Sequence, residues 1–201
     1  MLKKLKRNIS IWWIQSEKRA IFAMKWWCWW SNQYQKIERT FMKTDKSKLK
    51  KWVDEKRKFK NISEAWKTYC DENNLEHYGS DPWYMLFDVI SAPERIMVRK
   101  HIDCDDYSLL SYNYFGNYIN DGDSVYEFDG FYSIIWNEGN GHSIAIWKNM
   151  FKPKSYIMVS NDELVFIKDV KDSWNKINGG VKWLAKYKLC GKKLIFKRIV
   201  G

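Results

Sequence analysis

The spacing of apolar residues predicts a long helix near the start of the chain. Residues 11–43 contain no Gly or Pro, and large apolar side chains recur there at steps of three and four. Such steps place the apolar side chains on one face of an α-helix, which then buries that face. We expect the buried stripe to consist of Trp27, Trp30, Tyr34, Ile37 and Phe41.

Shorter helices are predicted in the next part of the chain. Residues 43–61 are strongly basic, which favours a solvated helix or a linker. The stretch NISEAWKTYCDENN then predicts a helix that Ser63 caps. In SDPWYMLFDVIS, Asp81 suits the cap of a helix and Pro82 its first position, where the missing N–H costs nothing. A short helix is expected at SAPE, and another directly after Cys104, in DYSLLSYNYF.

From Phe128 onward, apolar residues recur at every second position, which is the spacing of a β-strand. The runs FYSIIW, HSIAIW, YIMVSN and ELVFIK are rich in β-branched and aromatic residues, and Gly, Asn and Lys-Pro turns separate them. The segment SWNKINGGVKWLAKYK predicts a helix broken at Gly179 and Gly180, and KLIFKRIV predicts a last strand. Helices followed by an antiparallel sheet predict an α+β domain.

Charge divides the chain into two parts. Residues 1–60 hold 18 Lys or Arg against 5 Asp or Glu, a net charge of +13, whereas residues 61–201 hold 17 against 19, a net charge of −2. With 45% apolar residues the chain is too apolar for disorder, and its 201 residues suffice for a sizeable core. We expect a basic, Trp-rich helical extension over 1–60 and a globular domain over 61–201.

The cysteines and the apolar runs predict a cytoplasmic protein. The four cysteines lie far apart with no Cys-x-x-Cys pair, which favours free thiols in a reducing compartment. The longest apolar run, residues 20–30, contains a Lys, and it is much shorter than the roughly 20 residues of a spanning helix. The chain is therefore not expected to cross a membrane.

The Trp-rich extension has three interpretations. Its six Trp side chains between residues 12 and 30 and the surrounding Lys suit packing on the domain or on a protein partner, association with a membrane surface, or a nucleic-acid-binding arm. Packing is favoured first and the membrane surface second. Nucleic acid comes last, because the aromatic residues cluster apart from the densest run of Lys.

Cys104 and His142 are the candidate catalytic residues. Cys104 is expected near a helix N-terminus, where the positive end of the helix dipole favours the thiolate. Asp105 and Asp106 suit the first helical turn, but their charge raises the pKa of a neighbouring thiol. A base is therefore required as partner, and His142 begins the strand HSIAIW after a Gly-rich turn.

The pairing of HSIAIW with YIMVSN decides which residue faces His142. If residues whose numbers sum to 303 face one another, His142 meets Asn161 and the isoleucines meet apolar residues. Shifting the pairing by one places Asp162 opposite His142, but it sets Ile144 against Ser160, a poorer apolar match. The apolar pattern therefore favours Asn161.

A thiol at a helix N-terminus, an imidazole on a strand and an amide or carboxylate on the next strand are the parts of a Cys-His-Asn/Asp acyl-transfer site. The imidazole takes the thiol proton, the third residue orients the ring, and the thiolate attacks a carbonyl. The N–H of Cys104 is a candidate oxyanion donor. No cofactor or metal is expected, because Tyr126 and Tyr132, in the acidic stretch that begins at Asp121, stand where a calcium loop requires Gly and Glu, and no phosphate-binding glycine loop is found.

Three stretches resemble the transglutaminase-like superfamily, especially its bacterial cysteine proteinases. DVISAPERIMVRKHIDCDDYSLL is similar to the segment around the family's nucleophile, GHSIAIW to its His-bearing strand and VSND to its Asp-bearing strand. The resemblance covers roughly residues 75–170. Ile102 and Ser108 depart from the family's usual Gly and Ala, whereas the matching residues are Asp103, Cys104, Asp105, Asp106 and Tyr107.

The resemblance implies a papain-like fold and a thiol-dependent hydrolysis of amide bonds in a protein or peptide substrate. By it, Cys104 is the nucleophile, His142 the base, and Asn161 or Asp162 the orienting residue. The family's usual residue is Asp, which opposes the pairing argument, so both remain candidates. The alternative is a catalytically silent binding or adaptor module whose N-terminal helix docks a partner or a membrane surface, and the departures at Ile102 and Ser108 favour it.

Overall fold

The computed structural model describes residues 12, 15–55, 61–73, 75, 90–99, 102–138, 141–175 and 179–200. The described helices are α2 (Glu17–Phe41), α3 (Lys46–Glu55), α4 (Ile62–Glu72), α5 (Pro93–Ile96), α6 (Cys104–Phe115) and α7 (Val170–Trp174). The described strands are β1 (Tyr118–Asp121), β2 (Ser124–Trp136), β3 (Gly141–Asn149), β4 (Tyr156–Ser160), β5 (Glu163–Ile167), β6 (Val181–Cys190) and β7 (Lys193–Val200). The helix expected to begin at Asp81 lies outside the described residues.

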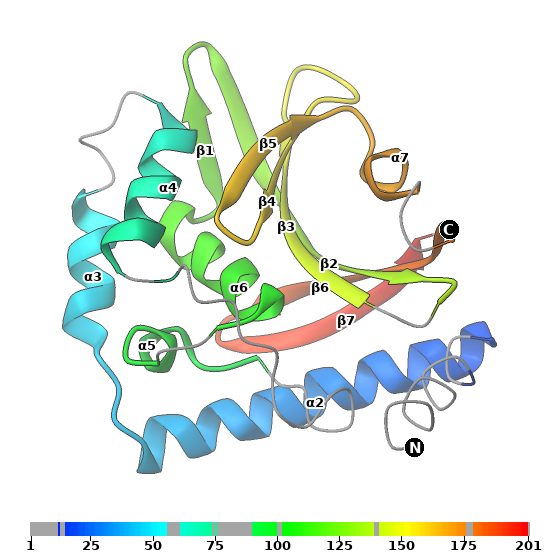
Figure 1. Ribbon diagram of the computed structural model, residues 1–201, viewed down its shortest axis with the longest axis horizontal. Helices are drawn as coiled ribbons and strands as arrows, with labels where there is room; N and C mark the ends of the chain where they lie inside the picture. The colour runs from blue at the N-terminus through cyan, green and yellow to red at the C-terminus, as the bar shows by residue number, and fades with distance from the viewer. Residues whose placement is uncertain are drawn as a thin grey trace.

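The α+β prediction is confirmed, because helices come first and an antiparallel sheet follows, with short α7 between β5 and β6 (Figure 1). The sheet has seven strands in the order β5-β4-β3-β2-β6-β7, and β1 pairs with β2 beside this path. Helices α4 and α6 lie on one side of the curved sheet and α7 on the other.

Both faces of the sheet are buried along its central strands β2, β3 and β4. The larger hydrophobic cluster lies between the sheet and helices α4 and α6. It is rich in aromatic rings, among which Tyr69 stacks on Trp66 and on Tyr114, and Trp147 meets Phe115 edge-on. A smaller cluster, with Ile144 and Ile146 of β3, lies on the side of α7. Burial on both faces explains why HSIAIW is nearly continuously apolar and does not alternate strictly.

Helix α2 belongs to the main core. Trp27 packs edge-on against Tyr187 of β6, with 5.2 Å between ring centroids, and Cys28 is part of the larger cluster. The side-chain amide of Asn32 donates to the carbonyl of Leu194 and accepts the N–H of the same residue. Asn32 thereby pairs with β7 much as a neighbouring strand does. The boundary expected at residue 60 therefore separates elements that share one hydrophobic core.

The face that α2 buries differs from the predicted one. Ile37 and Phe41 are 43% and 81% exposed, Trp30 and Tyr34 are half-buried, and Trp27 packs against the core. The apolar period was misleading because this helix buries polar side chains whose hydrogen bonds offset their desolvation. The residues that are buried are Ala20, Cys28, Ser31, Gln35 and Glu38.

Two local predictions were also wrong. The cap of α4 is Asn61, whose side chain accepts the N–H groups of Ser63 and Glu64, so Ser63 lies inside the helix. The chain after Gly180 forms strand β6 instead of the second half of a helix. Gly179 and Gly180 adopt φ values of 74° and 92°, which end helical geometry and let the next residues pair with β2.

The predicted pairing of β3 with β4 is off by one residue. Ala145 faces Val159 and Trp147 faces Ile157, so facing residues sum to 304 and not to 303. The prediction assumed that isoleucines must pair with apolar partners on a single buried face. Because both faces are buried, apolar partners occur in the observed register as well: Ile146 faces Met158, and Trp147, which lies on the side of α6 against Phe115, faces Ile157.

No described helix is sufficiently long and apolar to cross a membrane.

We predict that Trp147→Ala lowers the free energy of unfolding by about 3–5 kcal/mol, because a fully buried indole leaves a large cavity. Its ring packs against Phe115 and Phe128, and its Nε1–H donates to the carbonyl of Gly116 at 2.9 Å. Urea unfolding measures the change. Phe151→Ala is the matched control, since Phe151 is 72% exposed and its loss should cost less than about 0.5 kcal/mol. Equal losses in the two variants would contradict this account of the core.

Candidate active site

Cys104 is the first residue of α6, so it lies at a helix N-terminus as predicted. Asp103 precedes it with extended backbone and caps the helix, because its side chain accepts the N–H of Asp106 at 3.2 Å. The Cys104 side chain is half-buried, whereas Cys28 and Cys70 are buried and Cys190 is exposed. Burial raises the pKa of Cys28 to about 12 and also raises that of Cys70. Cys104 is thus the one cysteine that is partly accessible and also held at a helix start.

The Cys104 sulfur lies where the hydrogen-bonded ladder between β3 and β4 stops. The N–H of Ser143 donates to Sγ at 3.3 Å. Asn149 directs its N–H to the carbonyl of Ser155 just before β4. The odd-numbered residues of β3 therefore direct their backbone N–H and C=O groups toward β4. Continued by two residues, the register places Ser143 opposite Asn161. The thiol therefore accepts the N–H that the ladder would otherwise use.

Asn161 is where the chain leaves the sheet. Its φ of 53° lies in the left-handed region and turns the backbone between β4 and β5. Its carbonyl accepts the indole N–H of Trp66 at 3.0 Å instead of pairing with Ser143. The thiol and the indole thus take the two backbone hydrogen bonds that the interrupted ladder leaves.

His142 directly precedes Ser143 on β3, and its ring is held by Ser160. Nε2 of the ring and Oγ of Ser160 are 2.9 Å apart, and the ring lies 5.0 Å from the Trp174 ring centroid. Burial lowers the pKa of His142 to about 4, because the charged imidazolium is disfavoured away from water. The ring is therefore neutral near pH 7.

The two predicted orienting residues do not hold the imidazole. Asn161 is half-buried, and its Oδ1 is buried without a hydrogen-bond partner among the described residues. Asp162 is exposed, and its charge helps to raise the pKa of Cys70, so it faces α4. Ser160 was missed because the predicted register placed it on the other face of the sheet, opposite Ser143.

Cys104 and His142 approach each other at the end of the sheet and not across one face. His142 and Ser160 lie on the side of the smaller cluster, with Ile144, whereas α6 covers the other face. The N–H that reaches Sγ belongs to the residue after His142, so covalent geometry limits the distance from Sγ to the His142 Cα to about 6 Å. That distance is within the reach of an imidazole, although the ring's hydrogen bond in this structure is to Ser160.

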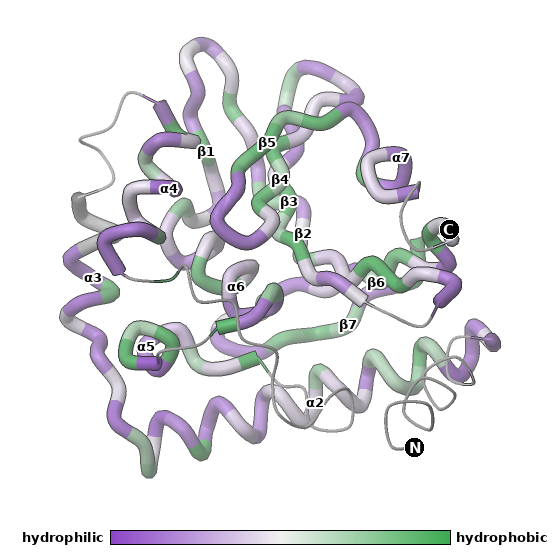
Figure 2. Tube along the Cα trace, in the orientation of Figure 1, coloured by the Kyte–Doolittle hydropathy of each residue, from purple (hydrophilic) through white to green (hydrophobic). Residues whose placement is uncertain are grey.

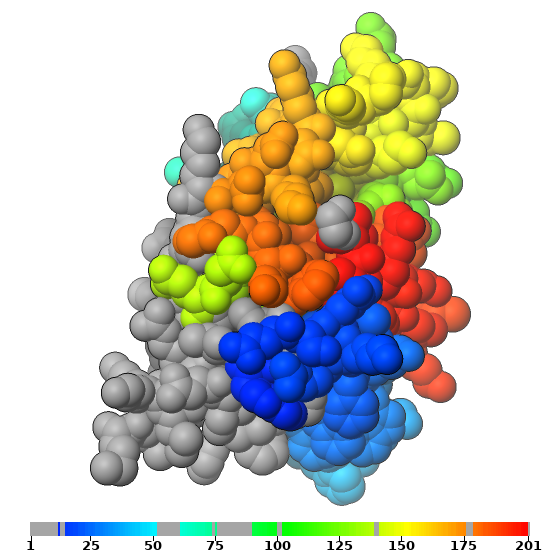
Figure 3. All heavy atoms as spheres, turned by 90° about the vertical axis from the view of Figure 1, so that its right-hand side faces the viewer, coloured from blue at the N-terminus to red at the C-terminus, as the bar shows by residue number. Residues whose placement is uncertain are grey.

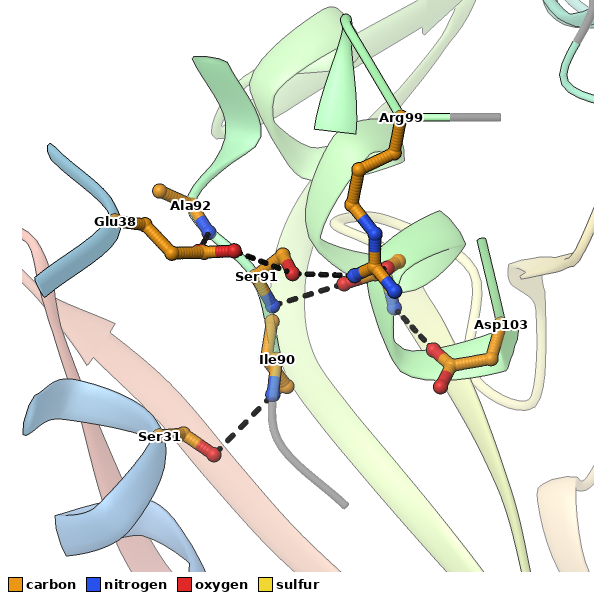
Figure 4. Close-up of polar contacts among 8 residues, drawn as sticks. Ser31, Glu38, Ile90, Ser91, Ala92, Arg99 and Asp103 are labelled. Atoms are coloured by element: carbon orange, nitrogen blue, oxygen red, sulfur yellow. Dashed lines mark hydrogen bonds and ion pairs between the residues drawn. The ribbon is translucent and has the colours of Figure 1, made fainter. Parts of the chain in front are cut away.

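A buried polar network fixes the start of α6 (Figure 4). One oxygen of Asp106 accepts the N–H of Ser91 at 2.9 Å, and the other accepts Nη1 of Arg99 at 3.0 Å. Glu38 of α2 accepts Ser91 Oγ at 3.0 Å and the N–H of Ala92 at 2.6 Å. Asp106 is therefore a structural anchor, and the cation of Arg99 offsets its charge close to the thiol.

A second polar feature lies away from Cys104. A cleft of about 430 Å³ opens on the α7 side of the sheet, lined in part by Tyr132, Tyr156, Lys148 and Arg198. Lys186 and Asp129 also line it, and Lys186 donates to Asp129 at 2.6 Å. Neither Cys104 nor His142 lines it. Among the described residues, no group of three His, Cys, Asp or Glu side chains is placed to hold a metal ion.

Comparisons with protein-family models, with curated proteins and with solved structures found no match to this chain. The resemblance to the transglutaminase-like superfamily therefore stays a prediction that rests on the residues around Cys104, His142 and Asn161.

We predict that acidification from pH 6.5 to 4 destabilises the protein partly through His142. Its pKa is about 4 in the folded state and near 6.5 in the unfolded chain, so the unfolded chain binds more protons between these values. The stabilising contribution, at most about 3 kcal/mol, is complete above pH 6.5 and is lost as the pH falls toward 4. Urea unfolding at several pH values, compared between the natural protein and His142→Gln, isolates this part. The same pH dependence in both proteins would show that His142 does not titrate in this way.

Proposed function

We propose that this protein is a thiol-dependent hydrolase of amide bonds, with a papain-like domain of the transglutaminase-like type and Cys104 as its nucleophile. The observation that carries the proposal is the position of the Cys104 sulfur in the interrupted β3–β4 ladder, where it accepts the N–H of Ser143 beside His142. A buried structural thiol would pack among side chains. The Cys104 sulfur instead takes the place of a backbone acceptor at the end of the β3–β4 ladder.

Three features favour the thiolate form of Cys104. The N-terminus of the twelve-residue helix α6 places the positive end of its dipole at the sulfur. The N–H of Ser143 donates to the sulfur, and such a bond strengthens when the acceptor becomes negative. Arg99 pairs with Asp106 and so reduces the repulsion that this carboxylate would exert on a thiolate.

In the proposed reaction, His142 removes the proton from Sγ, and the thiolate attacks the carbonyl carbon of an amide. The oxyanion that forms is stabilised by the N–H of Cys104, since first-turn amides have no acceptor inside their helix. The imidazolium then gives its proton to the leaving amine, and the C–N bond breaks to leave an acyl thioester. Water, deprotonated by the neutral His142, hydrolyses the thioester and restores the thiol.

Ser160 replaces the predicted third residue in this proposal. With Nε2 held by the hydroxyl of Ser160, Nδ1 is the nitrogen available for the thiol after the ring turns about its side-chain torsions. A hydroxyl donates or accepts according to need, so it orients a neutral ring without adding charge. Ser160 is therefore a positioning residue. A protein or peptide remains the proposed substrate.

The alternative is a catalytically silent module with the same fold, and one observation favours it. The ring of His142 is packed against Trp174 and bonded to Ser160, and its buried site lowers its pKa to about 4. A base with so low a pKa is a weak proton acceptor. Catalysis then requires that the ring leave the Trp174 contact while Ser160 still holds Nε2, whereas a silent module keeps both contacts.

We predict that iodoacetamide at pH 7 alkylates Cys104 at least about tenfold faster than the exposed Cys190, which represents an ordinary thiol. Cys28 and Cys70 should react slowest, because burial hinders access and raises the pKa of both. His142→Ala should slow Cys104 about tenfold or more and leave Cys190 unchanged. Peptide mapping by mass spectrometry gives the four rates. If Cys104 reacts no faster than Cys190, the silent module is the better description.

We predict that Ser160→Ala slows the alkylation of Cys104 about tenfold, because the imidazole loses the group that orients it. Asp162→Asn should leave the rate within about twofold, since Asp162 is exposed and faces α4. The rate should be followed from pH 5 to 9, because loss of an orienting group shifts the pH profile and a merely structural change does not. A large effect of Asp162→Asn or Asn161→Ala, with none of Ser160→Ala, would restore the predicted third residue.

A further inference from the structure

Helix α2 carries large apolar side chains on the side that faces away from the protein. Phe22 is 59% exposed, Trp26 54%, Trp29 49% and Ile37 43%. At 100° per residue, the directions of these four side chains around the helix axis lie within about 60° of their mean. Buried positions such as Ser31 lie on the opposite side of the helix. We call Phe22, Trp26, Trp29 and Ile37 the outer stripe of α2.

The outer stripe is not a part of the core. The opposite face of α2 already packs on β7 and on the segment before α5, through Asn32 and Glu38. Figure 1 shows α2 along one edge of the molecule, beyond β7, and Figure 3 shows its N-terminal half at the surface beside β7. Trp26 and Trp29 contact each other, with 5.0 Å between ring centroids. A contiguous exposed aromatic surface of this kind marks an interaction site.

Lysines alternate with the aromatic residues on the same side of the helix. Lys18, Lys25 and Lys36 are exposed and lie within about 60° of Phe22 around the helix axis. Of the two acidic residues of α2, Glu38 is buried and Glu17 is at the helix start. Figure 2 shows this mixture of hydrophobic and hydrophilic residues along α2. The outer side of α2 therefore combines aromatic rings with an excess of positive charge.

We propose that the outer stripe of α2 docks the protein on the surface of a bilayer that contains anionic phospholipids. Amphipathic indole rings and lysines are the side chains that suit the headgroup layer, where the rings enter the boundary and the ammonium groups meet phosphates. The net charge of +13 on residues 1–60 supplies long-range attraction to such a surface. This positive charge thus favours an anionic lipid surface as the binding partner of the outer stripe. A second copy of the protein would carry the same positive charge and would be repelled. The helix lies in the plane of the interface and does not cross the bilayer.

Co-sedimentation of the full chain with vesicles tests the proposal. Phosphatidylcholine vesicles with phosphatidylglycerol should bind the protein at least about tenfold more tightly than vesicles of phosphatidylcholine alone, and raising the salt from about 0.1 to about 0.5 M should weaken binding. Trp26→Ala with Trp29→Ala should lower the partition about tenfold or more. Lys18→Gln with Lys25→Gln should reduce both the partition and its salt dependence.

The matched control replaces two exposed aromatic residues far from α2. Tyr118 is 55% and Phe151 is 72% exposed, so Tyr118→Ala with Phe151→Ala removes a similar area. This control should bind vesicles within about twofold of the natural protein, and circular dichroism should show that all variants are folded. Failure to bind anionic vesicles, equal loss in the control, or a self-association that the Trp26 and Trp29 changes abolish would each overturn the proposal.

Discussion

The carboxylate of Asp106 connects three parts of the chain that are far apart in sequence. It accepts hydrogen bonds from Ser91 and Arg99, and Ser91 in turn donates to Glu38 of α2. Because Asp106 and Glu38 are almost fully buried, each hydrogen bond is needed to offset the desolvation of a charge. The start of α6, and with it the position of Cys104, therefore depends on α2 as well as on the sheet.

This dependence explains the composition of α2. The helix meets a polar backbone segment around Ala92 with Glu38, and it meets the edge strand β7 with Asn32, so its buried face must be polar. Burial raises the pKa of Glu38, because the charged carboxylate is disfavoured away from water. The large apolar residues of α2 therefore lie outside this polar face, where they are half-buried or exposed. The predicted core stripe is therefore surface only in part, since Ile37 and Phe41 are exposed whereas Trp27 packs on the core.

The sequence predicted the elements of the fold better than their mutual contacts. The helix after Cys104 and the strands after Phe128 follow from caps and from local period, which depend on residues close in the chain. The buried face of α2 was not predictable, because Ser31, Gln35 and Glu38 are buried by partners that are distant in sequence. The pairing of β3 with β4 was wrong for a related reason, since a sheet buried on both faces gives no signal for its register.

The candidate site shows the same division between local and distant information. Cys104 and His142 could be singled out because each follows a local signal, a helix start and a Gly-rich turn. Ser160 could not, because its role depends on a register that differs by one residue from the predicted one. The left-handed turn at Asn161 is decisive, since it ends the ladder and leaves the N–H of Ser143 to the thiol. A regular strand at this point would pair Ser143 with Asn161 and exclude the sulfur from the sheet edge. The irregular end of β4 is therefore the condition for any chemistry at Cys104, and the residue that creates it is Asn161, which the sequence had suggested for a different role.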